Sequence, residues 1–215
     1  AIPEGLPAIV TITLALSVNR ILRRGAVIRK LHAVETLGCA GVICTDKTGT
    51  ITQNKMTVQR IWVPGRTLNV SGSGYRAQGA VEENGRPVQA ARDAALGRLC
   101  EAASLCTTAH ITRAKDGYDV MGDPTEVAVL VAAAKAGVTK EALLQQYTVT
   151  GENPFDAARK RMSVTVSGPG GARLLCKGAP DMLLARCTHI ATPAGPRLLA
   201  PRDRADINAA CARMA

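Results

Sequence analysis

The pattern of apolar and charged positions sets the first part of the chain apart from the rest. Residues 1–19 contain a single charged residue, Glu4. A helix of that length would be about 28 Å long, close to the thickness of the hydrocarbon core of a bilayer. Basic residues follow at once, at positions 20, 23, 24, 29 and 30, a pattern typical of the cytoplasmic side of a membrane span. We therefore expect residues 1–22 to be the cytoplasmic part of a transmembrane helix, with the chain after about residue 22 in the cytosol.

A second interpretation of this apolar stretch stays open. Thr11, Thr13 and Ser17 interrupt the apolar run. A buried helix of a soluble protein tolerates such residues as well as a membrane span does, so the segment alone does not decide between the two.

The next segment, residues 23–60, carries short apolar runs between charged loops. Residues 27–29 favour a short strand, and residues 33–37 favour a helical turn that ends at Gly38. The run Gly-Val-Ile-Cys-Thr at 41–45 is typical of a buried parallel strand. Asp46 follows it directly, and ligands of open α/β sheets bind at the carboxyl ends of strands.

Mixed strand and helix patterns after residue 60 predict an α+β domain over residues 61–215. Glycine and proline positions mark its turns, including a hairpin turn at 167–171. Strands are expected at 58–63, 68–70, 162–166 and 173–177, and helices at 87–106, 124–136, 139–146 and 202–214.

Composition narrows the classes of function. The net charge is +10, which raises anionic partners such as nucleic acid, anionic lipid or phosphate-bearing ligands. No zinc-finger spacing, RNP-like aromatic motif or dense lysine tract accompanies that charge, so we expect no nucleic-acid partner. The seven cysteines show no CxxC spacing, which favours reduced, buried thiols in a cytosolic setting.

The strongest chemical signal is the run Cys-Thr-Asp-Lys-Thr-Gly-Thr-Ile-Thr at 44–52. A carboxylate such as Asp46 can attack a phosphoryl group and form an acyl phosphate. Lys47 adds positive charge, Thr48 adds a hydroxyl, and Gly49 allows the backbone to approach a phosphate closely. Such a loop, together with Mg²⁺, is sufficient in principle for phosphoryl transfer.

This run resembles the signature of P-type cation-transporting ATPases, in the calcium-pump-like group called P2-type. The resemblance implies a haloacid-dehalogenase-like, Rossmann-type α/β phosphorylation core, of which residues 23–60 are the first segment. It implies catalytic roles for Asp46, Lys47 and Thr48, with Mg²⁺ held at Asp46 and Thr48. Related phosphatases place a second Asp where this chain has Thr48, so an acyl phosphate on Asp46 would lack a local base to activate water.

The string Pro-Glu-Gly-Leu-Pro at 3–7 lies inside the apolar run and breaks its helix. It resembles the ion-binding break of calcium, sodium/potassium and proton/potassium pumps. The resemblance implies that Glu4 and the carbonyl of Ile2 bind the transported cation, Ca²⁺ being favoured. A kinked helix with a snorkelling Glu4 is the plainer alternative.

Three further strings resemble the nucleotide-binding domain of the same pumps. In Gly-Asp-Pro-Thr-Glu at 122–126, Glu126 is implied to contact the adenine amino group. In the run from Pro154 to Met162, Phe155 is implied to stack on adenine and Lys160 to lie near the phosphates. In Cys-Lys-Gly-Ala-Pro at 176–180, Lys177 and Gly178 are implied to line the ATP pocket. Each string also has a plainer interpretation on its own: a helix cap at 122–126, a core residue at Phe155 and an ordinary surface lysine at Lys177.

The resemblance covers essentially the whole chain and implies a piece of a longer, multi-pass membrane protein. The implied function is ATP-driven cation transport through an aspartyl phosphate on Asp46, with ATP, Mg²⁺, the cation and membrane lipid as partners. The missing actuator and phosphorylation-domain segments would come from the same protein, and the fragment alone would bind ATP only. A soluble phosphatase or phosphotransferase with the same core, and a non-catalytic nucleotide-binding module, are the alternatives.

Overall fold

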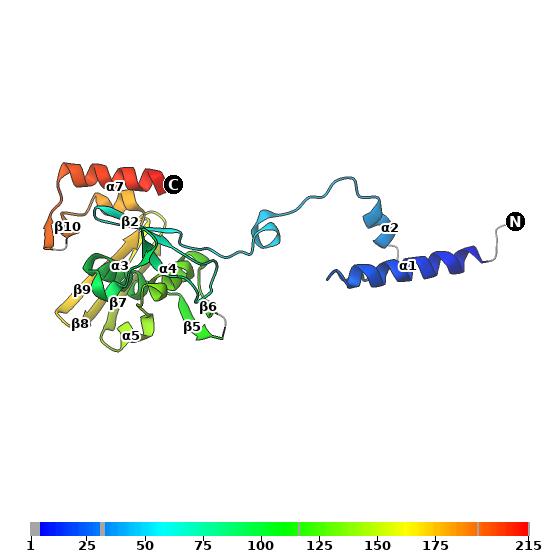
Figure 1. Cartoon of the computed structure of the whole chain (residues 1–215), viewed down its shortest axis with the longest axis horizontal. Helices are drawn as coiled ribbons and strands as arrows, with labels where there is room; N and C mark the ends of the chain where they lie inside the picture. The colour runs from blue at the N-terminus through cyan, green and yellow to red at the C-terminus, as the bar shows by residue number, and fades with distance from the viewer. Residues whose placement is uncertain (1–4, 31–32, 116, 193, 215) are drawn as a thin grey trace. The chain divides into compact units, whose positions relative to one another are not determined.

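The computed structural model describes residues 5–30, 33–115, 117–192 and 194–214. It divides the chain into two compact units, Ala1–Gln53 and Asn54–Ala215. Figure 1 shows the elements of both, and each unit is described by itself below.

The first unit contains helix α1 (Leu6–Leu22), the short helix α2 (Ala33–Gly38) and a five-residue turn at Lys47–Ile51. α1 confirms that the apolar stretch is helical. The hydroxyls of Thr11, Thr13 and Ser17 donate to the carbonyls four residues earlier, at 2.8 to 2.9 Å, so the helix itself satisfies its polar side chains. Among the described helices, none is both long enough and apolar enough to cross a membrane.

The strands predicted at 27–29 and 41–45 are wrong for this structure, because both segments lie outside any helix or strand. A strand needs a neighbour for its backbone hydrogen bonds, and each described sheet begins at or after Arg60. Val42 and Ile43 are accordingly 81% and 85% exposed. All described strand pairs are antiparallel, so no parallel α/β core is seen among these residues.

The second unit is an α+β domain, as predicted, and its sheets are antiparallel. β1 to β4 form one sheet in chain order, β7 to β9 form a second, and β5–β6 and β10–β11 are hairpins. The strands are β1 Arg60–Val63, β2 Arg66–Val70, β3 Val81–Glu83, β4 Arg86–Pro87, β5 His110–Ala114, β6 Gly117–Met121, β7 Thr148–Asp156, β8 Arg161–Gly168, β9 Gly171–Gly178, β10 His189–Thr192 and β11 Gly195–Leu198. The helices are η2 Ala90–Arg92, α3 Ala94–Leu105, α4 Pro124–Lys135, α5 Lys140–Leu144, α6 Pro180–Leu184 and α7 Pro201–Met214.

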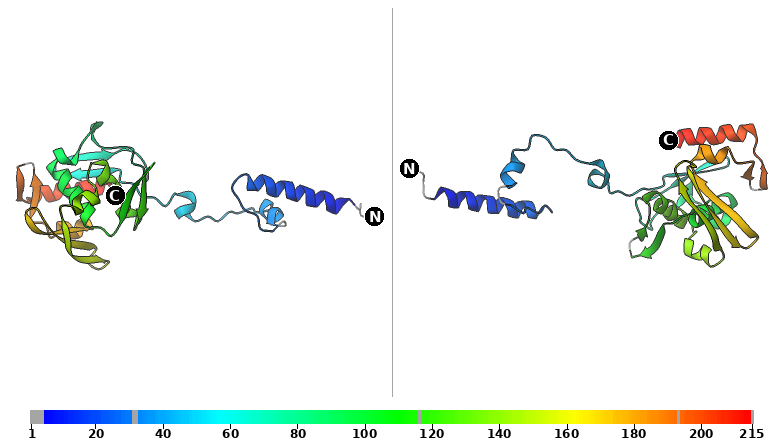
Figure 2. Two further views of the ribbon diagram at one scale, coloured as in Figure 1. Left: turned by 90° about the horizontal axis from the view of Figure 1, so that it is seen from below. Right: turned by 180° about the vertical axis from the view of Figure 1, so that it is seen from behind.

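Helices α3 and α4 form the centre of this unit, with sheets against them (Figures 1 and 2). One buried cluster joins them to the first sheet through Leu68, Val81 and Leu96. A second joins the end of α3 to β8 through Leu105 and Met162, and a third joins α4 to β5. The helices therefore hold the β7–β9 sheet at a fixed place relative to the start of α4.

The predicted helix at 87–106 is shorter in the structure. Pro87 pairs with Glu82 in the β3–β4 hairpin, and α3 begins only at Ala94. The reason is Asp93, whose side chain accepts a hydrogen bond from Leu96 N at 3.1 Å and caps the helix. Asp93 also forms an ion pair with Arg66 of β2.

The expected burial of the cysteines is partly wrong. All seven, which lie among the described residues, are free thiols, but only Cys100 and Cys106 are buried. Cys39, Cys44, Cys176 and Cys187 are exposed. Apolar neighbours in the sequence did not bury Cys39 and Cys44, because the described residues of the first unit form no sheet of their own.

Two helix caps give a test of this packing. Asp93→Ala removes both a cap and the partner of Arg66, so we expect it to lower the free energy of unfolding by about 2 kcal/mol. Asp123→Ala removes only the cap of α4 and is expected to cost about 1 kcal/mol. Urea unfolding of both variants measures the difference, and equal losses would contradict the added role of the ion pair.

Candidate nucleotide site

One end of the β7–β9 sheet gathers several residues that the sequence singled out. Asp156 of β7 lies opposite Arg161 of β8, which in turn lies opposite Gly178 of β9. Phe155, Lys160, Lys177 and Gly178 therefore lie at the same end of this sheet, although they come from two strands, β7 and β9, and from the turn between β7 and β8.

Phe155 is close to the end of β7 and its side chain remains in solvent. It is 64% exposed, and a register shift between Asn153 and Asp156 precedes the end of the strand. A bulge of this kind re-aims side chains near a strand end. The ring is thus free to stack on a planar ligand rather than being used in the core.

Gly178 is required by a close approach of two backbones. Lys160 has a φ of +49° in the turn before β8, and its carbonyl accepts a hydrogen bond from Ala179 N at 2.9 Å. A Cβ atom at Gly178 would lie 2.4 Å from that carbonyl oxygen. Any side chain at position 178 would therefore push β9 away from the turn, while the exposed Lys160 side chain is left free to move.

The centre of the site is an ion pair between Glu126 and Lys177. Lys177 Nζ donates to Glu126 Oε1 at 2.6 Å, and both side chains are less than one third exposed. Lys177 lies opposite the buried Met162, so it points to the helix-covered face of the sheet. Glu126 is in the first turn of α4, which Pro124 and the cap residue Asp123 begin.

The second oxygen of Glu126 is held by a loop that the sequence did not indicate. Glu126 Oε2 accepts hydrogen bonds from the Thr107 hydroxyl at 2.8 Å, and from the Thr108 amide and hydroxyl at 3.0 and 2.9 Å. It also accepts one from Ala109 N at 3.1 Å. Lys140 Nζ supports this loop by donating to the carbonyls of Thr107 and Ala109 at 2.9 and 3.0 Å.

These contacts fix the ionisation of the site. Burial by itself would raise the pKa of Glu126, but the hydrogen bonds from Lys177, Thr107 and Thr108 outweigh it and lower the pKa to about 2. Burial also lowers the pKa of Lys140 and raises that of the Cys106 thiol at the end of α3. At neutral pH Glu126 is therefore a carboxylate, which accepts hydrogen bonds and donates none.

The predicted phosphorylation residues lie in the other unit. Asp46 Oδ1 accepts a hydrogen bond from Lys47 N at 2.7 Å, and Thr52 N closes the turn on Lys47 O at 3.1 Å. Gly49 has a φ of +78° in this turn, a conformation that suits glycine. Lys47 and Thr48 are exposed beside it. The turn leaves the Asp46 side chain accessible to a ligand.

The predicted cation residues, Glu4 and Ile2, lie outside the described residues. Within the described part of the chain, no three His, Cys, Asp or Glu residues come together as a metal site. Asp46 and Thr48 do supply the oxygen donors that Mg²⁺ prefers.

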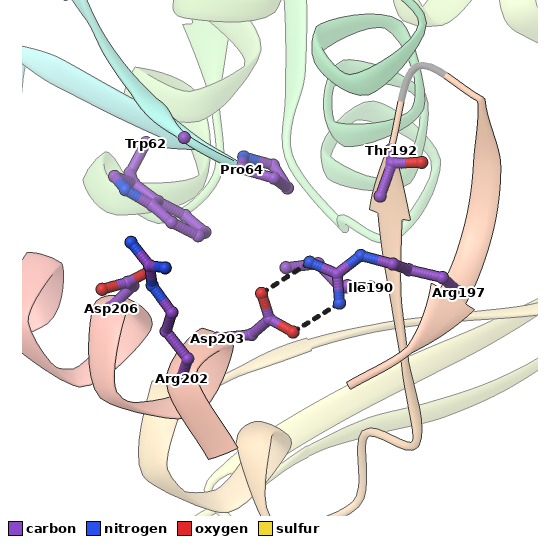
Figure 3. A pocket seen from close by; sticks show the side chains of 9 residues that line it. Trp62, Pro64, Ile190, Thr192, Arg197, Arg202, Asp203 and Asp206 are labelled. Atoms are coloured by element: carbon purple, nitrogen blue, oxygen red, sulfur yellow. Dashed lines mark hydrogen bonds and ion pairs between the residues drawn. The ribbon is translucent and has the colours of Figure 1, made fainter. Parts of the chain in front are cut away.

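A separate pocket of about 380 Å³ lies between β1, the β10–β11 hairpin and α7 (Figure 3). Arg197 spans it and donates to both oxygens of Asp203 at 2.6 and 2.7 Å. These bonds, with one from Ala200 N, lower the pKa of Asp203 to about 2. In Figure 3 the Arg202 side chain points toward Trp62. The ion pair between Arg197 and Asp203 joins α7 to the β10–β11 hairpin. None of the residues that line this pocket was predicted to bind nucleotide.

Comparison with known proteins identifies the family. Residues 95–215 match the family model of the P-type ATPase, cytoplasmic domain N, and the matched region contains Thr107, Glu126, Phe155 and Lys177. The chain therefore belongs to the P-type ATPase family.

Its relatives are calcium-transporting and cation-transporting ATPases of much greater length. The chain is 43% identical to a calcium-transporting ATPase of Bacillus subtilis over 216 residues, covering 100% of this chain and 24% of the relative. It is 39% identical to a cation-transporting ATPase of Synechocystis, with 97% and 23% covered. It is 44% identical to the human calcium-transporting ATPase type 2C member 1, with 76% and 17% covered. The chain thus spans about a quarter or less of these relatives.

The low pKa of Glu126 predicts acid sensitivity with a definite sign. Because the pKa falls from 4.5 to about 2 on folding, ionised Glu126 adds to the free energy of unfolding above about pH 4.5, and this contribution is lost as the pH falls toward 2. Urea unfolding between pH 6 and pH 2.5 should show a steeper loss in the wild-type chain than in Glu126→Gln. Parallel curves for the two chains would show that Glu126 carries no such linkage.

Proposed function

We propose that this chain is the part of an ATP-driven cation pump that binds ATP and contains the phosphorylated aspartate. The cation that we favour is Ca²⁺, because two of the three relatives compared above are named calcium-transporting. The observation that carries the proposal is the ionised Glu126, held by Lys177 and the loop after α3 at the sheet end that also contains exposed Phe155.

Nucleotide binding would divide the work among the sheet-end residues. Phe155 would stack on the adenine ring, and the Glu126 carboxylate would accept a hydrogen bond from the adenine amino group. Lys177 would line the pocket with Gly178, whose missing side chain lets β9 lie close against the turn that carries Lys160. Lys160 would extend toward the phosphates, since its side chain is exposed and free of the sheet.

Phosphoryl transfer would take place at Asp46. Its carboxylate would attack the γ-phosphorus of ATP, forming an acyl phosphate while the bond to the β-γ bridging oxygen breaks and ADP leaves. Lys47 and the Thr48 hydroxyl would offset the charge on the phosphoryl oxygens. Asp46 and Thr48 would hold Mg²⁺, which when bound supplies further positive charge. Because Thr48 is not a base, the phosphoenzyme would persist.

Transport would require parts beyond this chain. Residues 1–22 would form the cytoplasmic part of a transmembrane helix in which Glu4 and the Ile2 carbonyl bind the cation. Residues 23–60 would begin the phosphorylation domain, and residues 61–215 would form the nucleotide-binding domain in the cytosol. The actuator domain and the rest of the phosphorylation domain would come from the same longer protein. The basic residues after α1 would face anionic lipid headgroups.

The 215-residue chain tests nucleotide binding directly. We expect the wild-type chain to bind ATP, and Phe155→Ala to weaken binding about tenfold because the stacking surface is lost. Isothermal titration calorimetry measures the Kd of both chains. Leu174→Ala removes another exposed apolar side chain of the same sheet and serves as the control. Unchanged affinity in Phe155→Ala would reject the stacking role.

The longer protein that contains this chain tests the phosphorylation step. With γ-labelled ATP we expect a label that is acid-stable, sensitive to hydroxylamine and dependent on Ca²⁺. Asp46→Asn should abolish it because an amide cannot form the acyl phosphate, whereas Asp119→Asn, at an exposed position of β6, should retain it. A label that persists in Asp46→Asn would refute the site, and a label that needs no cation would favour a phosphatase or phosphotransferase.

A further inference from the structure

Lys140 makes an unusual set of contacts for a lysine on a short helix. It is the first residue of α5, and burial lowers its pKa. Its ammonium donates to two backbone carbonyls, those of Thr107 and Ala109, at 2.9 and 3.0 Å. Both carbonyls belong to the loop that holds Glu126.

The connection from Lys140 to Glu126 passes through one peptide group. The carbonyl of Thr107 and the amide N–H of Thr108 belong to the same peptide unit. Its oxygen accepts from the Lys140 ammonium, and its N–H donates to Glu126 Oε2 at 3.0 Å. A positive charge at the oxygen polarises the peptide and strengthens the bond that its N–H donates. The contacts therefore form a chain from ammonium to peptide to carboxylate.

We propose that Lys140 is a positioning residue that makes this site select a 6-amino purine over a 6-oxo purine. It acts by holding the Thr107–Ala109 loop so that Glu126 presents an ionised, correctly oriented carboxylate to the base. This inference rests on the proposed nucleotide function of the site and adds the origin of its base preference.

The selectivity follows from hydrogen-bond chemistry. An ionised carboxylate only accepts hydrogen bonds, so it pairs with the exocyclic amino group of adenine. The exocyclic oxygen of guanine is itself an acceptor and would face the carboxylate without a proton between them. A site that hydrogen-bonds a particular group of its ligand rejects an analogue without that group, because the buried acceptors of the site are then left unpaired. A Glu126 that turned away or took up a proton would lose this discrimination.

Other charged groups surround Glu126 and enter the balance. Lys177 of β9 contacts it directly. The Lys140 ammonium interacts electrostatically with Glu126 itself, with Glu141 of its own helix α5, and with Lys177 and Glu152 of the sheet. Lys177 is part of the binding site itself, so its replacement would not separate binding from positioning. Lys140 offers that separation, because its two described hydrogen bonds go to the loop and its charge acts on Glu126 only through space.

Lys140→Met in the 215-residue chain tests the proposal by removing the ammonium and keeping the length of the side chain. We expect its Kd for ATP to rise about fivefold while its Kd for GTP is unchanged. The selectivity for ATP, measured as the Kd for GTP divided by the Kd for ATP, then falls by the same factor. NMR titration of the Glu126 side-chain carboxyl carbon should show its pKa rising from about 2 toward 4.5. Lys140→Arg, which keeps the charge, should restore most of both values.

Lys135→Met is the matched control. Lys135 is buried, whereas Lys140 is half-buried, and its ammonium also donates to a backbone carbonyl, that of Ser71 at 2.7 Å, which belongs to a loop of the first sheet. This variant should lose stability while it keeps the wild-type Kd ratio and the wild-type Glu126 pKa. An equal loss of selectivity in Lys135→Met would show a general effect of unfolding and would overturn the proposal.

Thr108→Val provides a second route should Lys140→Met fail to fold. Thr108 is exposed, and the substitution removes its hydroxyl, which donates to Glu126 Oε2. The Glu126 pKa should therefore rise and the selectivity for ATP should fall. A folded Lys140→Met or Thr108→Val chain with wild-type selectivity and Glu126 pKa would refute the proposal. If the wild-type chain binds no ATP, the nucleotide function fails, and the Glu126 titration in Lys140→Met still decides whether Lys140 supports the ionised state of Glu126.

Discussion

The Glu126 carboxylate is the point on which the second unit depends. It is bound by Lys177 from β9 and by the loop that follows α3, while its own backbone begins α4. Three elements distant in sequence therefore meet at one charged group, which desolvation would penalise if any of its partners were missing. The contacts that satisfy the charge also fix the orientation of the carboxylate. The local stability around Glu126 and the geometry of the candidate nucleotide site therefore have the same cause.

Much of the fold could be read from local patterns. α4 follows from Asp123 and Pro124 at its start, and the β8–β9 hairpin follows from the turn near Gly170. The predicted strand at 41–45 failed for a different reason. Its apolar run would pair only inside a sheet, and the described residues supply no neighbouring strand for it. Periodicity reports what a segment can bury, but pairing depends on which other segments are present.

The site was predicted in part. Glu126, Phe155, Lys160, Lys177 and Gly178 were proposed because short strings around them resemble a known family, and the register of β7–β9 brings the last four to one end of a sheet. Thr107, Thr108 and Lys140 were missed because their roles depend on tertiary contacts. Thr108 reaches Glu126 across 18 residues of sequence, and no spacing rule connects them. A Thr-Thr pair directly after a helix was the only local signal, and it is a common one.

The bulged form of β7 has a consequence for how this domain behaves in solution. Among the described strands β7 pairs only with β8, and all nine of its residues are exposed, which leaves one side of its backbone without a partner strand. A long, flat strand edge without a partner is a template on which further copies can add. Two register shifts, between Val149 and Gly151 and between Asn153 and Asp156, bend the edge out of the plane that such addition needs. The irregularity that turns Phe155 outward thus also guards the domain against edge-to-edge assembly.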